Sequence, residues 1–171
     1  FANRKPAPVN KTFGRLQIIS SAWFALTHGA NDGQKTMGII ALILFSAGMI
    51  PELDIPLWVI FAAAAAMGLG TFFGGYKVIK TLGVKITRLK PYQGFAAETG
   101  GGLMLAAFAI LGIPASTTHA ITGTIMGSGA ARRKRAVRWN VSRQIVFSWI
   151  ITIPGAAGMG IGFTYLIHLF V

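Results

Sequence analysis

The run His28–Gly38, HGANDGQKTMG, holds the side chains of this sequence that are best suited to chemistry. It contains a carboxylate at Asp32 and an ammonium group at Lys35, together with a histidine and two side-chain amides. Strongly apolar segments flank it, IISSAWFAL before it and IIALILF after it. A carboxylate flanked by apolar helix can hold a cation through its oxygens or carry a proton. The run therefore predicts a polar site inside an apolar protein.

A second reactive group lies at Ala115–His119, ASTTH, where three hydroxyls stand at the start of an expected helix. Helix N-termini attract anions through free N–H groups and the helix dipole, and hydroxyls add further donors. Glu98 is also flanked by apolar helix and is a candidate for cation coupling beside Asp32. The alternative is structural, since Asp32 and Ser116 would also serve as helix caps.

The two inner histidines and the lysine are secondary candidates. His28 and His119 could ligate a metal or shuttle a proton, but no HxxxH or HExxH spacing supports a metal site. Hydrogen bonding at helix ends is therefore favoured for both. Lys35 is expected to pair with Asp32 or with the substrate, or to extend away from the apolar core. The one predicted metal ligand is Asp32, for Na⁺.

Composition indicates a membrane protein. The chain has 171 residues, of which 53% are hydrophobic and 12% charged, against about 25% charged in soluble domains. It has no cysteine, so disulfides and thiolate metal sites are excluded. The net charge of +12 comes from three basic blocks, at 4–15, 77–90 and 132–143, separated by apolar runs. This pattern is typical of cytoplasmic loops, and no binding to nucleic acid is expected.

The apolar runs predict membrane spans. Residues 57–76 are uncharged and, at about 1.5 Å per residue, match a hydrocarbon core of about 30 Å. Residues 144–169 form a last span. Residues 16–50 would reach about 52 Å as one straight helix. We therefore expect one crossing that is broken at the polar run 28–38.

Residues 92–131 have basic segments on both sides, which predicts that both ends are cytoplasmic. A re-entrant helical hairpin with its turn at 112–116 fits best, and two thin spans are the alternative. Residues 1–15 are expected to be a cytoplasmic segment before a membrane domain over 16–171. The broken span, the two full spans and the hairpin together carry the chain from one side of the membrane to the other. A second copy of this unit in the same protein would therefore insert upside down. The predicted fold is an all-α membrane protein, one inverted-repeat half with a broken transmembrane helix, full spans and this hairpin.

The predicted break has a chemical consequence. It opens a second helix start near 34–37, and two half-helix starts aimed at one place form an anion site at the membrane midplane. The free amide groups of the broken helix are the physical basis of this expectation. A continuous helix over Asn31–Gln34 would contradict it and the function built on it.

These segments together resemble the inorganic phosphate transporter (PiT) family, membrane permeases that co-transport phosphate with a cation. The run HGANDGQKTMG resembles the signature of that family. The runs GFAAETGGG and LGIPASTTHAITGTIMGSGAARR resemble its second conserved region, and RAVRWNVSRQIVFSWIITIPGAAG resembles the region after it. The family has two inverted halves, and this chain is similar to the C-terminal half of the bacterial type.

The resemblance implies symport of phosphate with Na⁺ or H⁺ by alternating access, without a cofactor and without enzymatic activity. The phosphate-binding residues would be Asn31, Asp32, Gln34, Ser116, Thr117 and Thr118. The cation-coupling residues would be Asp32, Asn31 and Glu98. The secondary positions, for a proton or other contacts, would be His28, His119 and Lys35.

The implied partners are inorganic phosphate, the lipid bilayer of the inner cell membrane and the missing N-terminal half, while a homodimer is left open. A complete permease is more than twice this length, so this half alone should transport little. Two alternatives remain open. One is an intramembrane enzyme that uses Asp32 with His28 or Glu98 as acid and base. The other is a structural half-subunit whose polar residues only fix helix packing.

Overall fold

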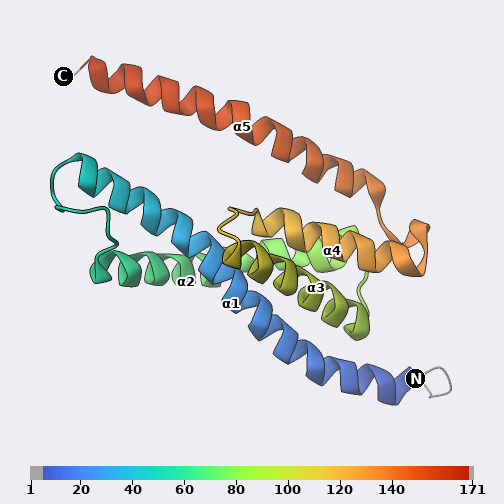
Figure 1. Cartoon of the computed structure of the whole chain (residues 1–171). Helices are drawn as coiled ribbons and strands as arrows, with labels where there is room; N and C mark the ends of the chain where they lie inside the picture. The colour runs from blue at the N-terminus through green and yellow to red at the C-terminus, as the bar shows by residue number, and fades with distance from the viewer. Residues whose placement is uncertain (1–5, 170–171) are drawn as a thin grey trace. The chain divides into compact units, whose positions relative to one another are not determined.

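The computed structural model describes residues 6–169, and these are almost entirely helical (Figure 1). The chain divides into two units, Phe1–Val137 and Arg138–Val171, each described by itself. The elements of the first unit are α1 (Pro6–Ser46), α2 (Leu57–Lys80), the π-helix η1 (Thr81–Ile86), α3 (Pro91–Ile110), α4 (Thr117–Arg132) and the short 3₁₀ turn η2 (Lys134–Ala136). The second unit holds α5 (Trp139–His168). Of the predicted cytoplasmic segment, residues 1–5 lie outside the described residues and the rest begins α1.

The predicted break in the first span is wrong, because α1 runs without interruption from Pro6 to Ser46. Its polar side chains bond at helical spacing instead. Asn31 Nδ2 donates to the Thr27 carbonyl at 3.0 Å, and Thr36 Oγ1 donates to the Asp32 carbonyl at 3.2 Å. Bonds of this i, i+4 kind leave the helix intact. Gly29 and Gly33 cost about 1 kcal/mol each relative to alanine, which tertiary context routinely overrides.

Within the described residues, two helices are long and apolar enough to cross a membrane, and they cover the predicted full spans 57–76 and 144–169 except for residue 169. Residues 57–76 lie within Leu57–Ile86, which is 30 residues long because η1 continues α2. Residues 144–168 lie within Trp139–His168, also 30 residues long. By length and composition, both agree with the sequence prediction.

The predicted helical hairpin over 92–131 is present as α3, a turn and α4 (Figure 1). Gly112 ends α3 with a φ of +67°, a conformation that glycine adopts without steric cost. The N–H groups of Gly112 and Ile113 return to the carbonyls of Ala109 and Phe108, which closes the helix end. Pro114 lies in the turn, and α4 begins at Thr117.

Helix α3 packs closely on α1 because it carries glycines on the facing side. A Cβ atom at Gly102 would lie 2.5 Å from Trp23, and one at Gly94 would lie 2.2 Å from the Gln17 amide. Leu105, on the same helix, is fully buried. Small residues bring helix backbones together in this way in membrane proteins. This packing fixes the polar part of α1 against the hairpin.

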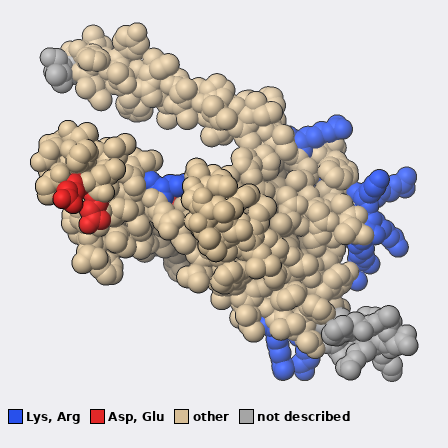
Figure 2. All heavy atoms as spheres, in the orientation of Figure 1, with Lys and Arg blue, Asp and Glu red and all other residues tan. Residues whose placement is uncertain are grey.

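Charge is distributed unevenly over the first unit. Figure 2 shows most of the lysines and arginines toward one end, near the start of α1 and over the end of α4 and η2. The acidic spheres at the opposite end lie over the segment that joins α1 to α2, which contains Glu52 and Asp54. The described basic residues of the block at 4–15 and those of the third block that belong to this unit therefore lie toward the same end, as expected for loops on one side of a membrane.

Candidate functional site

A cavity of about 940 Å³ is lined by α1, α2, η1, α3 and α4, all in the first unit. Most of its lining is apolar or glycine. The polar or charged side chains that line it, apart from Tyr76, are Gln17, His28, Thr71, Glu98, Thr117 and Thr118. The two reactive regions singled out in the sequence thus meet at one cavity. Four of the predicted site residues are among these polar lining residues.

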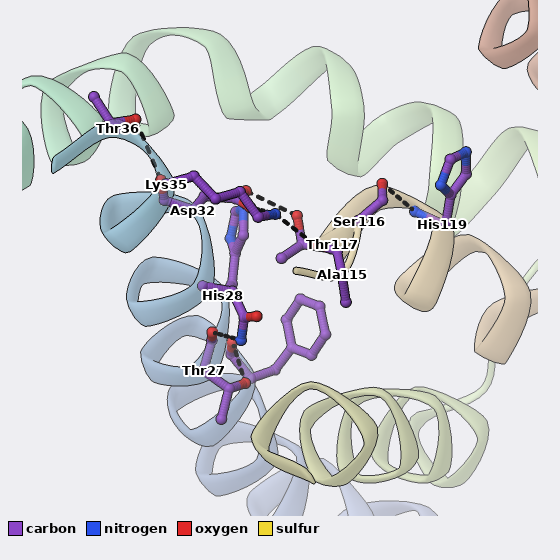
Figure 3. Close-up of polar contacts among 11 residues, drawn as sticks. Thr27, His28, Asp32, Lys35, Thr36, Ala115, Ser116, Thr117 and His119 are labelled. Atoms are coloured by element: carbon purple, nitrogen blue, oxygen red, sulfur yellow. Dashed lines mark hydrogen bonds and ion pairs between the residues drawn. The ribbon is translucent and has the colours of Figure 1, made fainter. Parts of the chain in front are cut away.

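At one end of the site, Asp32 connects α1 to the start of α4 (Figure 3). Its Oδ2 accepts a hydrogen bond of 2.8 Å from Thr117 Oγ1 and lies 3.1 Å from His28 Nε2. Its Oδ1 lies 3.1 Å from Lys35 Nζ, and Lys35 also donates to the Ala115 carbonyl. Both carboxylate oxygens are therefore engaged, and the hairpin turn is tied to α1 at two points.

Glu98, on α3, has different surroundings. Its Oε2 accepts hydrogen bonds from Ser20 Oγ at 2.6 Å and Ser21 Oγ at 3.0 Å. Its Oε1 accepts a longer bond of 3.4 Å from Gln17 Nε2. Across residues 6–169, the ion pairs within 4 Å involve Asp32 and not Glu98. Glu98 is thus a carboxylate held by neutral donors beside a cavity.

Gln17, Ser20 and Ser21 were not identified from the sequence. Their positions, at i, i+3 and i+4, place all three on one face of a helix. This polar face within an apolar stretch was the signal that could have identified them. Because each donates to Glu98, they fix the carboxylate from the opposite helix.

The described cavity is not lined by four of the six predicted phosphate ligands, which are Asn31, Asp32, Gln34 and Ser116. Asn31 is buried, with 5% of its surface exposed. Its Nδ2 donates to the carbonyls of Thr27 at 3.0 Å and Leu105 at 3.2 Å, so it joins α1 to α3. Gln34 is exposed.

Ser116 and His119 belong together at the start of α4. The Ser116 side chain accepts a 3.3 Å hydrogen bond from the His119 N–H and caps the helix, as the structural alternative expected. Both residues line a second cavity, of about 370 Å³, rather than the one beside Glu98. Neither role requires a bound anion.

The structure leaves one helix start at the site instead of two. Because α1 is continuous, the expected start near 34–37 is absent, and with it the free amide groups of that segment. The start of α4 remains, where the first N–H groups have no acceptor within the helix. Thr117 and Thr118 add hydroxyls there and line the cavity. The chemistry available is an anion site at one helix start and a carboxylate in the same cavity.

The comparisons with known proteins agree with one another. The model of the phosphate transporter family matches residues 2–160. A protein of Rhizobium meliloti named "Probable low-affinity inorganic phosphate transporter" is 53% identical over 158 residues, which cover 92% of this chain and 47% of that protein. A protein of the same name from Bacillus subtilis is 42% identical, over 94% of this chain and 48% of that protein.

A solved structure described as "The sodium-dependent phosphate transporter" is also similar. It matches with a TM-score of 0.76 and 34% identity, over 89% of this chain and 39% of that chain. The chain thus spans about half the length of the curated relatives it matches.

Proposed function

As the chain belongs to the phosphate transporter family, we propose that it forms one half of a membrane protein that carries inorganic phosphate together with a cation. The observation that carries this proposal is the single cavity onto which both the start of α4 and the Glu98 carboxylate open. The family consists of transporters, so the chain is not an enzyme and the intramembrane-enzyme alternative is set aside.

Phosphate is proposed to bind at the start of α4. Thr118 offers a hydroxyl donor at the cavity, and the first N–H groups of the helix point toward its N-terminus. The Thr117 hydroxyl donates its one proton to Asp32, so it would accept a hydrogen bond from a protonated phosphate oxygen. A tetrahedral oxyanion matches such a ring of donors, and the helix dipole favours its charge. Asp32 takes no direct part in this scheme. It orients the Thr117 hydroxyl through the 2.8 Å hydrogen bond.

The coupling cation is proposed to bind at Glu98. Its carboxylate, the Ser20 and Ser21 hydroxyls and the Gln17 side-chain amide supply the oxygen ligands that hard cations prefer. The similar solved structure is described as that of a sodium-dependent transporter, which favours Na⁺ over H⁺. A cation at Glu98 would cancel the charge of the carboxylate. It would thereby remove the repulsion of an incoming phosphate dianion, which is the physical basis of coupling.

Alternating access is the proposed transport mechanism. Phosphate and cation together bind better to one arrangement of the two halves, and this shifts the population between arrangements that open to either side. The second half is proposed to close the cavity. The basic end of the first unit is proposed to face the cytoplasm and the segment with Glu52 and Asp54 to face outward, across the inner membrane.

A chimera tests this proposal. The matching half of the Rhizobium meliloti relative is replaced by this chain, and uptake of radiolabelled phosphate is measured in cells that lack their own phosphate uptake. We expect uptake that rises with external Na⁺. A pH gradient without Na⁺ is the arm that tests H⁺ coupling. If the chimera reaches the membrane but takes up no phosphate while the intact relative does, the proposal fails.

A further inference from the structure

The ammonium group of Lys35 lies among oxygen atoms from both α1 and the hairpin turn (Figure 3). Lys35 Nζ is 3.1 Å from Asp32 Oδ1 and donates to the carbonyl of Ala115, 80 positions along the chain. Thr117 Oγ1 bonds to the other oxygen of the same carboxylate. One carboxylate oxygen and one carbonyl outside any helix thus contact a single positive charge, and a hydroxyl contacts the other oxygen of the same carboxylate.

This set of oxygens has the chemistry of a sodium site. Hard cations bind carboxylate, hydroxyl and carbonyl oxygens, and carbonyls freed from helical bonding coordinate Na⁺ in transporters. The ammonium of Lys35 already contacts two of these oxygens. A free Na⁺ beside it would be repelled by a like charge and would find few oxygens unengaged. The predicted Na⁺ site at Asp32 therefore does not fit this chain as it stands.

We propose that Lys35 is a tethered cation that replaces a mobile coupling ion at Asp32. The proposal rests on the proposed function and deepens it by naming which carboxylate takes an ion. Lysine suits this role because its ammonium is a compact point charge with three donors. Asp32 is then neutralised whether or not Na⁺ is present, the hairpin turn stays docked on α1, and only Glu98 remains to bind the mobile cation in this half.

A plain salt bridge on a helix is the competing explanation. Asp32 and Lys35 are at i, i+3 spacing, and the side chains are 29% and 37% exposed. Such pairs are worth little to stability. The bond to Ala115 goes beyond that explanation, because it reaches from α1 to the turn that precedes α4. The two explanations differ in what happens when the lysine is removed. A tethered cation leaves a vacancy for Na⁺, and a plain salt bridge does not.

The experiment measures the thermal midpoint of the purified chain in lipid nanodiscs, without phosphate, in Na⁺ and in choline at equal ionic strength. A Glu98→Gln background removes the other sodium response. In that background, we expect the thermal midpoint of Lys35→Ala to be about 3 °C higher in Na⁺ than in choline. Adding Asp32→Asn to this variant should abolish the difference. Lys11→Ala, which removes an exposed lysine from the same helix, should gain nothing.

Two results would overturn the proposal. One is a folded Lys35→Ala variant with no sodium-specific stabilisation. The other is a higher thermal midpoint in Na⁺ than in choline for the chain that retains Lys35, if Asp32→Asn removes this difference. If the double variant does not fold, Lys35→Ala alone is compared with Lys35→Ala/Asp32→Asn, where an equal sodium response in both also overturns it. Because phosphate is absent throughout, failure of the uptake experiment and failure of this one are distinguishable.

Discussion

Asp32 and Glu98 differ in the charge of their neighbours. Asp32 lies within 3.1 Å of a lysine ammonium and a histidine nitrogen. Glu98 is held by two hydroxyls and an amide and lies beside the cavity. A carboxylate without a charged partner in an apolar setting is costly unless a cation joins it. This difference is the reason why the mobile cation is proposed to bind at Glu98.

Replacing Glu98 by glutamine keeps the size of the side chain and removes its charge. We expect the sodium stimulation of phosphate uptake by the chimera to fall at least about ten-fold, equivalent to about 1.4 kcal/mol of lost cation binding. The measurement is the initial uptake rate as a function of external Na⁺. Glu52→Gln, in the exposed segment after α1, is the matched control. Full sodium stimulation in the Glu98→Gln chimera would contradict the assignment.

Thr117 is predicted to act both on phosphate and on the docking of the hairpin. Thr117→Ala removes the hydroxyl that is proposed to contact phosphate. A hydrogen bond to a charged group is worth about 1.5–3 kcal/mol, so the apparent phosphate affinity should fall about 10- to 100-fold. Phosphate-dependent uptake measures this, and Thr117→Ser should restore most of the affinity. Thr124→Ala is the control on the same helix, because the Thr124 hydroxyl bonds only to backbone carbonyls of α4. Equal losses in both alanine variants would indicate a general packing effect.

At the scale of elements, the sequence predicted which segments are helical but not whether one of them is broken. The spans at 57–76 and 144–169 and the hairpin at 92–131 follow from apolar length, flanking charge and turn residues, all local signals. The continuity of α1 depends on the hydrogen-bond partners of its polar side chains, and the local sequence pattern does not identify those partners. Polar residues in an apolar run look like an interruption, yet at helical spacing they bond to one another and to the turn of another helix.

For the candidate site too, the sequence predicted some features and not others. The reactive residues Asp32, Glu98 and Thr117 were identifiable because polar side chains in apolar segments require partners. Which partners they have was not identifiable, because Glu98 is held from 77 to 81 positions away. The expected anion site lost its amide groups on α1 when that helix proved continuous. Membership of the family therefore rests on the comparisons and not on a broken helix.

The packing of α3 on α1 provides a prediction at this scale. In Gly102→Ala the added methyl group would lie 2.5 Å from Trp23, so we expect a loss of about 1–3 kcal/mol from overpacking. This corresponds to a thermal midpoint lower by roughly 2–4 °C per kcal/mol. Gly100→Ala is the control in the same glycine run, since its nearest neighbour would be 4.0 Å away. Similar midpoints for the two variants would show that α3 and α1 do not pack as described.

At the scale of the whole molecule, the polarity of the first unit predicts its orientation in the membrane. The chain has no cysteine, so single cysteines can be introduced without a background. We expect Glu52→Cys in intact cells to react with a membrane-impermeant maleimide, and Arg88→Cys to react only after the membrane is opened. Both positions are exposed and lie between helices. The reverse pattern would place the basic end outside and contradict the proposed orientation.

Phosphate binding by the half itself separates transport from the structural-subunit alternative. If the cavity binds phosphate, adding phosphate should raise the thermal midpoint of the purified chain, and Thr117→Ala/Thr118→Ala should remove the rise. A structural half-subunit would show no response to phosphate in either form. Sulfate at the same concentration serves as the control for ionic strength.

The central claim is that one cavity holds phosphate at the start of α4 and a cation at Glu98. The most direct measurement is an experimental density map of the chimera in phosphate and Na⁺. We predict density for a tetrahedral anion within hydrogen-bond distance of the Thr117 and Thr118 hydroxyls, and a separate ion beside Glu98. Phosphate bound away from α4, with the cavity filled only by lipid or water, would contradict the claim.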